Sequence, residues 1–122
     1  MHNCQQYLID RYSVKSVFDD TGCFPVGQWL RRFANLMIEY GYNRKIEFSC
    51  NMRFGSLTRE DYRLMKKAGF RMLLFGVESG SQATLDRLNK GTTVEGIINE
   101  CKIPKEEGLE PHITIMVGYP WE

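Results

Sequence analysis

Three glycines divide this chain into repeating units and constrain its fold more than any other feature. Gly41, Gly69 and Gly108 each follow an amphipathic segment and precede an apolar run by a few residues. A glycine just past a helix end supplies the left-handed cap that other residues adopt at a cost. The order helix, glycine, strand and loop, repeated along the chain, predicts an α/β fold with consecutive β-α units on a parallel sheet.

The spacing of apolar residues places the individual elements. Short apolar runs predict strands over residues 14–18, 45–50, 71–77 and 112–117. Helical spacing predicts helices over residues 5–12, 26–40, 58–68 and 83–89, and another from residue 93 onward. Thr58 and Asp61 suit a capping box at the start of the third helix, although Asp reaches less far than Glu. Pro104 is expected to kink or end the last helix.

Two helices have apolar residues spaced to form an inner face. In the helix over 26–40 that face is predicted to hold Val26, Trp29, Leu30, Phe33, Leu36, Met37 and Tyr40. In the helix from residue 93 it is predicted to hold Val94, Ile97, Ile98 and Cys101. Cys101 is therefore interpreted as a core residue.

Length and charge indicate one folded domain and argue against several function classes. A chain of 122 residues is long enough for a core but short for a complete barrel. Sixteen basic and fifteen acidic residues leave a net charge of +1, and no basic stripe indicates nucleic-acid binding. No apolar stretch approaches the roughly 18 residues of a membrane span, and the N-terminus lacks the regions of a signal peptide. We interpret the protein as cytoplasmic.

The cysteines do not form a recognisable metal motif. Cys4, Cys23, Cys50 and Cys101 are widely spaced, with no Cys-x-x-Cys pair among them. In a cytoplasmic chain they are expected to be reduced thiols. His2 and Cys4 together give only a weak signal for a metal site.

Polar residues gather where each predicted strand ends. Asp19, Asp20 and Thr21 follow the first strand, and Cys50, Asn51 and Arg53 end the second. Glu78 and Ser79 follow the third, and Gly118, Tyr119 and Pro120 follow the fourth. The carboxyl edge of a parallel sheet is where α/β folds bind ligands. The residues alone leave ordinary alternatives: an Asx turn at Asp19, a surface ion pair for Arg53, and a solvated or helix-capping Glu78.

One long motif resembles a known family. Gly76-Val77-Glu78-Ser79-Gly80 is followed by Thr84-Leu85-Asp86-Arg87-Leu88-Asn89-Lys90-Gly91. This run resembles the fourth strand and following helix of the radical S-adenosylmethionine (radical SAM) superfamily. It looks most like the branch whose members often carry a cobalamin-binding domain, and the resemblance extends over nearly all 122 residues.

The resemblance implies roles for the polar residues. Asp19, Asp20 and Thr21 would approach the amino and carboxylate groups of S-adenosylmethionine, and Cys50, Asn51 and Arg53 would lie near it. Glu78 would accept hydrogen bonds from the ribose hydroxyls, with Ser79 assisting. The segment ending in Gly118, Tyr119 and Pro120 would run beside the adenine. No residue of this chain is implied as catalytic or as a metal ligand.

The resemblance also implies that the chain is a fragment. The family's Cys-x-x-x-Cys-x-x-Cys motif, which holds a 4Fe-4S cluster that splits S-adenosylmethionine into a 5′-deoxyadenosyl radical, is absent from the sequence. Residues 1–122 would form strands two to five of a partial TIM-like (β/α)6 barrel, and this chain alone is expected to be inactive. The expected cofactors of the parent enzyme are S-adenosylmethionine and the cluster, with cobalamin bound by a domain outside this chain.

Two other interpretations fit the residues. The glycines at 76–80 and 118 suit a phosphate-binding β/α-barrel fragment, although Glu78 would repel the anion. Alternatively, open sheet edges suit a non-catalytic module that forms homo-oligomers with other copies of itself.

Overall fold

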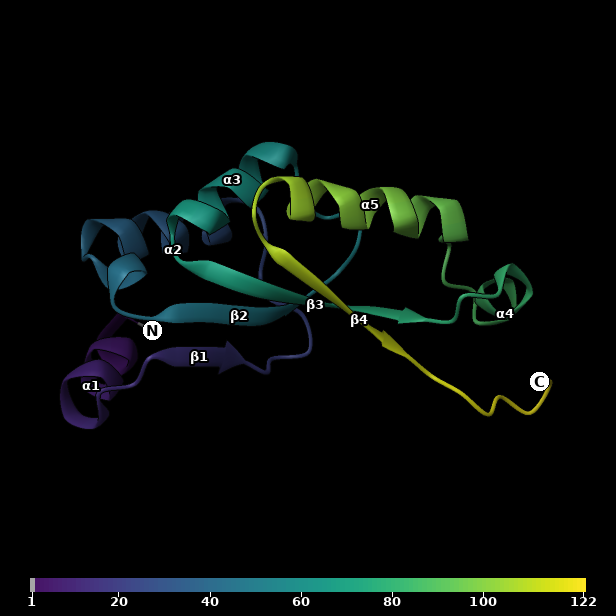
Figure 1. Ribbon diagram of the computed structural model, residues 1–122, viewed down its shortest axis with the longest axis horizontal. Coiled ribbons are helices and arrows are strands. Elements are labelled where there is room, and N and C mark those ends of the chain that lie inside the picture. Colours follow the sequence, from purple (N-terminus) through teal and green to yellow (C-terminus); the bar gives the residue numbers. More distant parts are fainter. Residues whose placement is uncertain (1) are drawn as a thin grey trace.

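Four parallel strands form a single sheet in the order β1-β2-β3-β4, as the computed structural model shows for residues 2–122 (Figure 1). The strands are β1 (Ser16–Asp19), β2 (Glu47–Met52), β3 (Phe70–Glu78) and β4 (Glu110–Ile115). Each pairs with its neighbour in parallel, and the β2–β3 and β3–β4 ladders each contain one irregularity. The predicted α/β fold of consecutive β-α units is confirmed.

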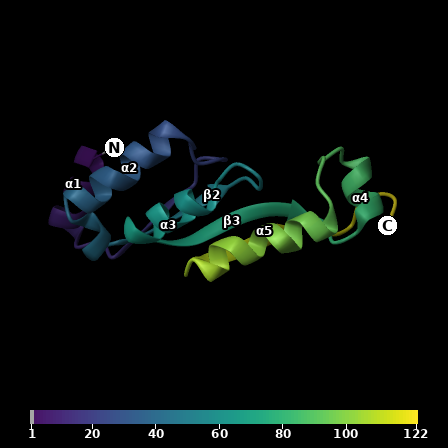
Figure 2. The ribbon, with the colours of Figure 1, turned by 90° about the horizontal axis from the view of Figure 1, so that it is seen from above.

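Three of the helices, α2 (Gln28–Glu39), α3 (Arg59–Lys67) and α5 (Val94–Glu106), cover one face of this sheet (Figure 1). The others are α1 (His2–Tyr12) and α4 (Gln82–Arg87), with a 3-10 turn η1 (Tyr42–Arg44). Figures 1 and 2 show α2, α3 and α5 together on one side of the strands, with α4 beyond the end of β3. No described helix is long and apolar enough to cross a membrane.

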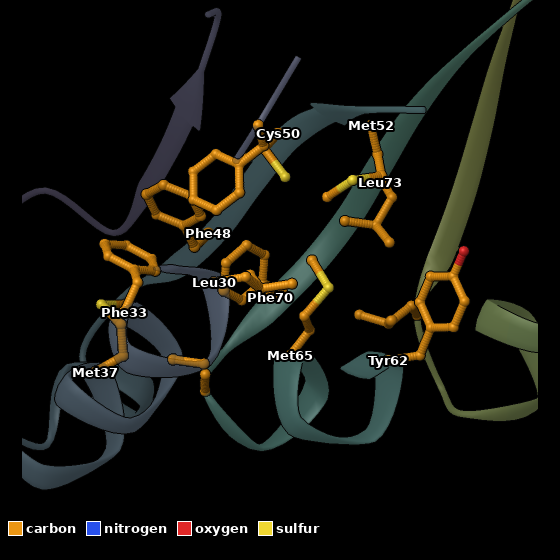
Figure 3. Packing of buried hydrophobic residues seen from close by; sticks show 14 of the residues in the cluster. Leu30, Phe33, Met37, Phe48, Cys50, Met52, Tyr62, Met65, Phe70 and Leu73 are labelled. Atoms are coloured by element: carbon orange, nitrogen blue, oxygen red, sulfur yellow. The ribbon is translucent and has the colours of Figure 1, made fainter. Parts of the chain in front are cut away.

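Alternation along the strands builds the core under α2 and α3. Phe48, Cys50 and Met52 of β2 are buried, and so are Phe70 and Leu73 of β3 (Figure 3). Successive side chains of a strand point to opposite faces, so Ser49 and Asn51 of β2 point to the side without helices. Burial of this apolar face stabilises the sheet and leaves its other face available for polar groups.

The local signals for helix ends are confirmed. Thr58 and Asp61 form the predicted capping box, with the Thr58 hydroxyl accepting from the Asp61 N–H and the Asp61 carboxylate accepting from the Thr58 N–H. Gly69 has a φ of +91°, and a Cβ there would lie 2.9 Å from the Cα of Asn43. Glycine is therefore required at position 69 both by the turn and by the close approach of a neighbouring segment.

Several predicted boundaries and faces need correction. In α5 the helix continues through Pro104 to Glu106, so Pro104 does not end it. Pro104 lies in the last turn, where the buried ring packs into the structure at the expense of one backbone hydrogen bond. β4 begins at Glu110 and ends at Ile115, two residues earlier at each end than predicted.

The predicted helix faces are also only partly buried. Leu30, Phe33 and Met37 of α2 are buried as expected, but Val26, Trp29 and Tyr40 are exposed. Val26 and Tyr40 lie outside α2, which spans residues 28–39. In α5, Ile98 is 52% exposed, and Cys101 is half-buried beside a small cluster of Val77, Leu85 and Ile97.

β4 is an edge strand with an uncovered apolar face. Ile113 is 47% exposed and Ile115 is 55% exposed. Ile113 is in register with Phe75 of β3, which is fully buried. The helix-side face of the sheet is therefore covered over β2 and β3 but open over β4.

Candidate functional site

The side chains opposite the core bring two predicted site residues together at the carboxyl edge. Asn51 lies between the buried Cys50 and Met52 on β2, so its side chain points to the face without helices. Its Nδ2 donates a hydrogen bond to Oδ1 of Asp20, at 3.1 Å. The loop after β1 and the end of β2 are thus joined by a polar contact.

Asp19 and Thr21 use their polar atoms within the first loop. The Thr21 N–H donates to Asp19 Oδ1 at 3.0 Å, and the Thr21 hydroxyl bonds to the same oxygen. This is an Asx turn, which fixes the direction in which the chain leaves β1. Asp20, the next residue, is the one held against Asn51.

Cys50 lies on the other side of the sheet from this contact. It is fully buried in the core, and burial, with smaller contributions from Asp19 and Cys23, raises the pKa of its thiol. The group is therefore a neutral thiol at ordinary pH. The structure does not bring Cys50 to the polar face that carries Asn51.

Glu78 stands at a distortion at the end of β3. The register with β4 shifts between Gly76 and Glu78, and Glu78 has a φ of +73°, in the left-handed region. The Met116 N–H donates to the Glu78 carbonyl at 2.9 Å, which holds this backbone in place. A glutamate in this conformation is strained, and such strain gathers at functional sites.

The Glu78 carboxylate folds back over Gly76. A Cβ on Gly76 would lie 3.0 Å from Glu78 Oε1, so glycine at position 76 leaves room for the carboxylate. Lys90 Nζ lies 3.5 Å from the same oxygen and donates to the Gly76 carbonyl at 3.4 Å. The spacing of Gly76 and Glu78 therefore allows the Glu78 carboxylate to lie against the strand and to face Lys90.

Lys90 was not predicted as a site residue, although it belongs to the motif that carried the resemblance. Asn89 and Gly91 both have positive φ values, so the chain turns back after α4 and returns Lys90 to β3. The cluster Asn89-Lys90-Gly91 signalled this turn in the sequence. The position that Lys90 reaches after this turn depends on the packing of α4 against β3, so the local sequence could not predict it.

Ser79 supports the loop that follows Glu78. It is 5% exposed, and its hydroxyl oxygen accepts a hydrogen bond from the Ser81 N–H at 3.0 Å. That bond shapes the turn into α4.

The loop after β2 presents Arg53 and is tied down from two sides. The Ser56 hydroxyl donates to the Arg53 carbonyl at 2.6 Å, and the Phe54 ring stacks on Phe75 with centroids 4.3 Å apart. The Gly55 N–H donates to Glu100 Oε2 of α5 at 2.6 Å. Arg53 itself is exposed and forms no ion pair with any described residue. Glu100 is a second functional candidate that sequence reasoning missed, because only tertiary packing brings α5 to this loop.

A cavity of about 550 Å³ lies at this edge of the sheet. Arg53, Glu78, Lys90 and Glu100 line it, two cations and two carboxylates, together with Cys23 and Thr92. Asp20 and Asn51 lie outside its lining. The cavity therefore joins the loops after β2 and β3, and its balanced charges suit a ligand that carries charges of both signs.

The segment after β4 returns towards α4 and Glu78. Gly118 has a φ of +84°, and the Tyr119 ring stacks on Trp121 with centroids 5.0 Å apart. Trp121 Nε1 donates to the Thr84 hydroxyl of α4 at 3.2 Å. Burial and the nearby Glu78 raise the pKa of Tyr119. The predicted site segment at Gly118, Tyr119 and Pro120 is thus held beside the end of β3.

The described residues do not form a metal centre. No group of three His, Cys, Asp or Glu side chains among them is arranged to hold a metal ion. Cys4 and Cys23 are exposed, Cys101 is half-buried, and Cys50 is in the core. These thiols do not fit an iron–sulfur cluster, which needs several converging thiolates.

Comparison with known proteins identifies the family. The sequence matches the Radical SAM superfamily over residues 19–122. The chain belongs to the radical SAM superfamily. An uncharacterised methyltransferase of Pyrococcus horikoshii is 29% identical over 77 residues, which are 63% of this chain and 17% of that protein.

The fold is also that of solved radical SAM structures. The cobalamin-dependent S-adenosylmethionine radical enzyme OxsB with aqua-cobalamin bound is similar with a TM-score of 0.68 and 20% identity. With both aqua-cobalamin and S-adenosylmethionine bound, the TM-score is 0.66. Each comparison covers 96% of this chain and 19% of OxsB, so the chain spans about a fifth of that enzyme's length.

Proposed function

We propose that this chain supplies part of the S-adenosylmethionine pocket of a radical SAM enzyme. Membership of the family and the likeness to OxsB support this proposal, as does the polar edge of the sheet. Residues 1–122 would form one partial core domain, equivalent to strands two to five of the barrel. The whole protein would use S-adenosylmethionine for radical chemistry on a substrate of its own.

The proposed binding residues are those that the fold leaves facing the open edge. Glu78 would accept hydrogen bonds from the two ribose hydroxyls, since a carboxylate offers acceptors for both donors. Asp20, held by Asn51, would face the ammonium group of the methionine part, and Arg53 would pair with its carboxylate. The backbone from Ile113 to Gly118 would pass beside the adenine.

The observation that carries this proposal is the position of the Glu78 carboxylate. It lies over Gly76, on strained backbone, in a cavity that also holds Lys90 and Arg53. A solvated or helix-capping glutamate needs neither the positive φ nor the space that glycine provides. The same carboxylate disfavours the phosphate-binding alternative, because it would repel the anion.

The cluster and cobalamin would be held elsewhere in the protein. The described cysteines do not fit a cluster, so its ligands would come from another segment. Cobalamin would be bound by a separate domain, as the likeness to a cobalamin-dependent enzyme suggests. All four cysteines are free, as in proteins of the reducing cytoplasm, which is the compartment we propose.

The test is Glu78→Gln in the complete protein, with S-adenosylmethionine affinity measured by calorimetry. We expect a loss of about 1–3 kcal/mol, the scale of a hydrogen bond to a charged group. Glu95→Gln is the matched control, since Glu95 is an exposed glutamate on α5 outside the cavity. Equal affinities of Glu78→Gln and the control would remove the ribose role.

A non-catalytic module that pairs with copies of itself is the second candidate. The observation in its favour is the uncovered segment directly after β4, where Met116 is 56% exposed and Val117 is 88% exposed. Apolar edge segments of this kind favour association. Size-exclusion chromatography of the complete protein separates the two candidates when combined with the binding measurement: a dimer without S-adenosylmethionine affinity would favour the module.

A further inference from the structure

A second cavity lies away from the carboxyl edge, between α1 and α2. Its volume is about 320 Å³, at the lower end of the range for small-molecule sites. It is lined by Gln5, Trp29, Arg32, Phe33, Leu36, Met37 and Tyr42. None of these residues lines the cavity that holds Glu78. The two cavities are therefore separate sites on the molecule.

One face of α2 forms an aromatic wall. Trp29, Arg32, Phe33 and Leu36 are spaced three and four residues apart, so they share a side of the helix. The rings of Trp29 and Phe33 stack nearly parallel, with centroids 5.4 Å apart and planes 10° apart. Phe33 is buried, whereas Trp29 is 41% exposed. The outer indole thus offers a flat apolar surface at the cavity.

Two hydrogen-bond donors without partners among the described residues line the same cavity. Gln5 is only 4% exposed, yet its buried Nε2 has no acceptor among the described residues. Arg32 is exposed and has no carboxylate within ion-pair distance in the described part of the chain. A buried amide without an acceptor loses its hydration without compensation, and native structures rarely keep one. An oxygen atom of a ligand would satisfy it.

We propose that the α1–α2 cavity binds a small aromatic carboxylate. The ring of the ligand would stack on Trp29, and its carboxylate would accept from Gln5 Nε2 and pair with Arg32. A neutral apolar molecule would leave Gln5 unsatisfied, and a cation would meet the charge of Arg32. The apolar wall, the unpaired donor and the unpaired cation thus specify one ligand chemistry.

The test uses this chain with 3-phenylpropionate as the probe and its neutral amide as the comparison. Met37 lines the cavity, so the carbon-13 resonance of its methyl group reports binding at this place. We expect the carboxylate to shift the Met37 signal with a dissociation constant in the millimolar range or below, about −4 kcal/mol or stronger. The amide should bind at least about fivefold more weakly, because it cannot form the ion pair.

Substitutions of Gln5 and Arg32 separate the role of each donor in binding the probe from any effect on folding. Gln5→Leu removes the buried donor, and we expect probe affinity to fall about tenfold, with the melting temperature unchanged or raised. Arg32→Gln should lower affinity about threefold and abolish its salt dependence. Arg44→Gln is the matched control: Arg44 is exposed, lies in η1 and does not line the cavity.

Three outcomes would overturn the proposal. The first is an unmoved Met37 signal up to about 10 mM probe, weaker than any useful affinity. The second is equal binding of the acid and the amide. The third is a concentration-dependent dimer that protects Met37 without the probe, since a second copy would then occupy the cavity. None of these results depends on S-adenosylmethionine, so the proposed function is tested separately.

Discussion

The helix-covered face of the sheet consists of buried apolar side chains, whereas its carboxyl edge carries exposed polar ones. On the covered face, Phe48, Leu73 and Phe75 are 1% exposed or less and pack under α2 and α3. At the edge, Asp20 and Arg53 are exposed, and Glu78 adopts a strained backbone beside a register shift. The covered face contributes apolar burial to the stability of the fold, whereas the carboxyl edge keeps polar groups in place with single hydrogen bonds.

The difference teaches how one strand serves both purposes. Cys50 and Met52 point into the core while Asn51, between them, holds Asp20 on the other side. Because side chains alternate, core packing and polar contacts are assigned to neighbouring residues without conflict. Substitutions on the covered face should change the free energy of unfolding, and those at the edge should change affinity.

The largest effect is expected from Phe75→Ala. Phe75 is fully buried and stacks on Phe54, so its removal leaves a cavity and should cost about 3–5 kcal/mol of unfolding free energy. Ile113 is its register partner on β4 but is 47% exposed, so Ile113→Ala should cost about 1 kcal/mol or less. Urea unfolding measures both. Similar losses at the two positions would mean that β4 is covered in solution.

A smaller effect is expected at the start of α3, where a buried carboxylate joins two helices. Asp61 accepts hydrogen bonds from Arg31 Nε at 2.9 Å and from the N–H and hydroxyl of Thr58, both at 3.0 Å. Burial alone would raise the pKa of Asp61, but the bonds from Arg31 and Thr58 outweigh it and lower that pKa below 3.8. The ionised form is therefore favoured in the folded state.

The sign of the pH dependence follows from this lowered pKa. The contribution of Asp61 is fully present above the unfolded pKa near 3.8 and is lost as pH falls through the lower folded value. Asp61→Asn should therefore be less stable than the parent chain at pH 6, and the gap should narrow below about pH 4. Thr58→Ala, which removes the cap itself, should cost about 1 kcal/mol. Asp10→Asn, at an exposed position, is the control; a gap independent of pH would contradict the assignment.

The sequence predicted the covered face better than the edge. The glycines at 41, 69 and 108 are local signals, and the consecutive β-α units that they predicted on a parallel sheet are confirmed. The partners of Glu78 and Gly55 were not predictable, because Lys90 and Glu100 reach them from other elements. Exposure of Trp29 was missed for a similar reason: helical spacing gives a face, but what packs on that face depends on α1.

The smallest effect on stability, and the sharpest test of how the two regions are joined, is expected at Glu100. This residue belongs to α5, a helix of the covered face, yet its carboxylate accepts the Gly55 N–H at 2.6 Å in the loop that presents Arg53. Glu100→Ala removes the acceptor, so amide exchange at Gly55 should quicken about tenfold while the unfolding free energy barely changes. Hydrogen exchange measured by NMR reports both quantities.

Glu100→Gln separates the hydrogen bond from the charge. The glutamine oxygen can still accept from Gly55, so slow exchange should largely return, whereas a purely electrostatic role would leave it fast. In the complete protein, Glu100→Ala should weaken S-adenosylmethionine binding less than Glu78→Gln, because it loosens Arg53 without removing a ligand contact. If Gly55 exchanges equally fast in the parent chain and in Glu100→Ala, α5 does not hold this loop. The carboxyl edge would then be shaped by the strands alone, and the stacking of Phe54 on Phe75 would be its main support.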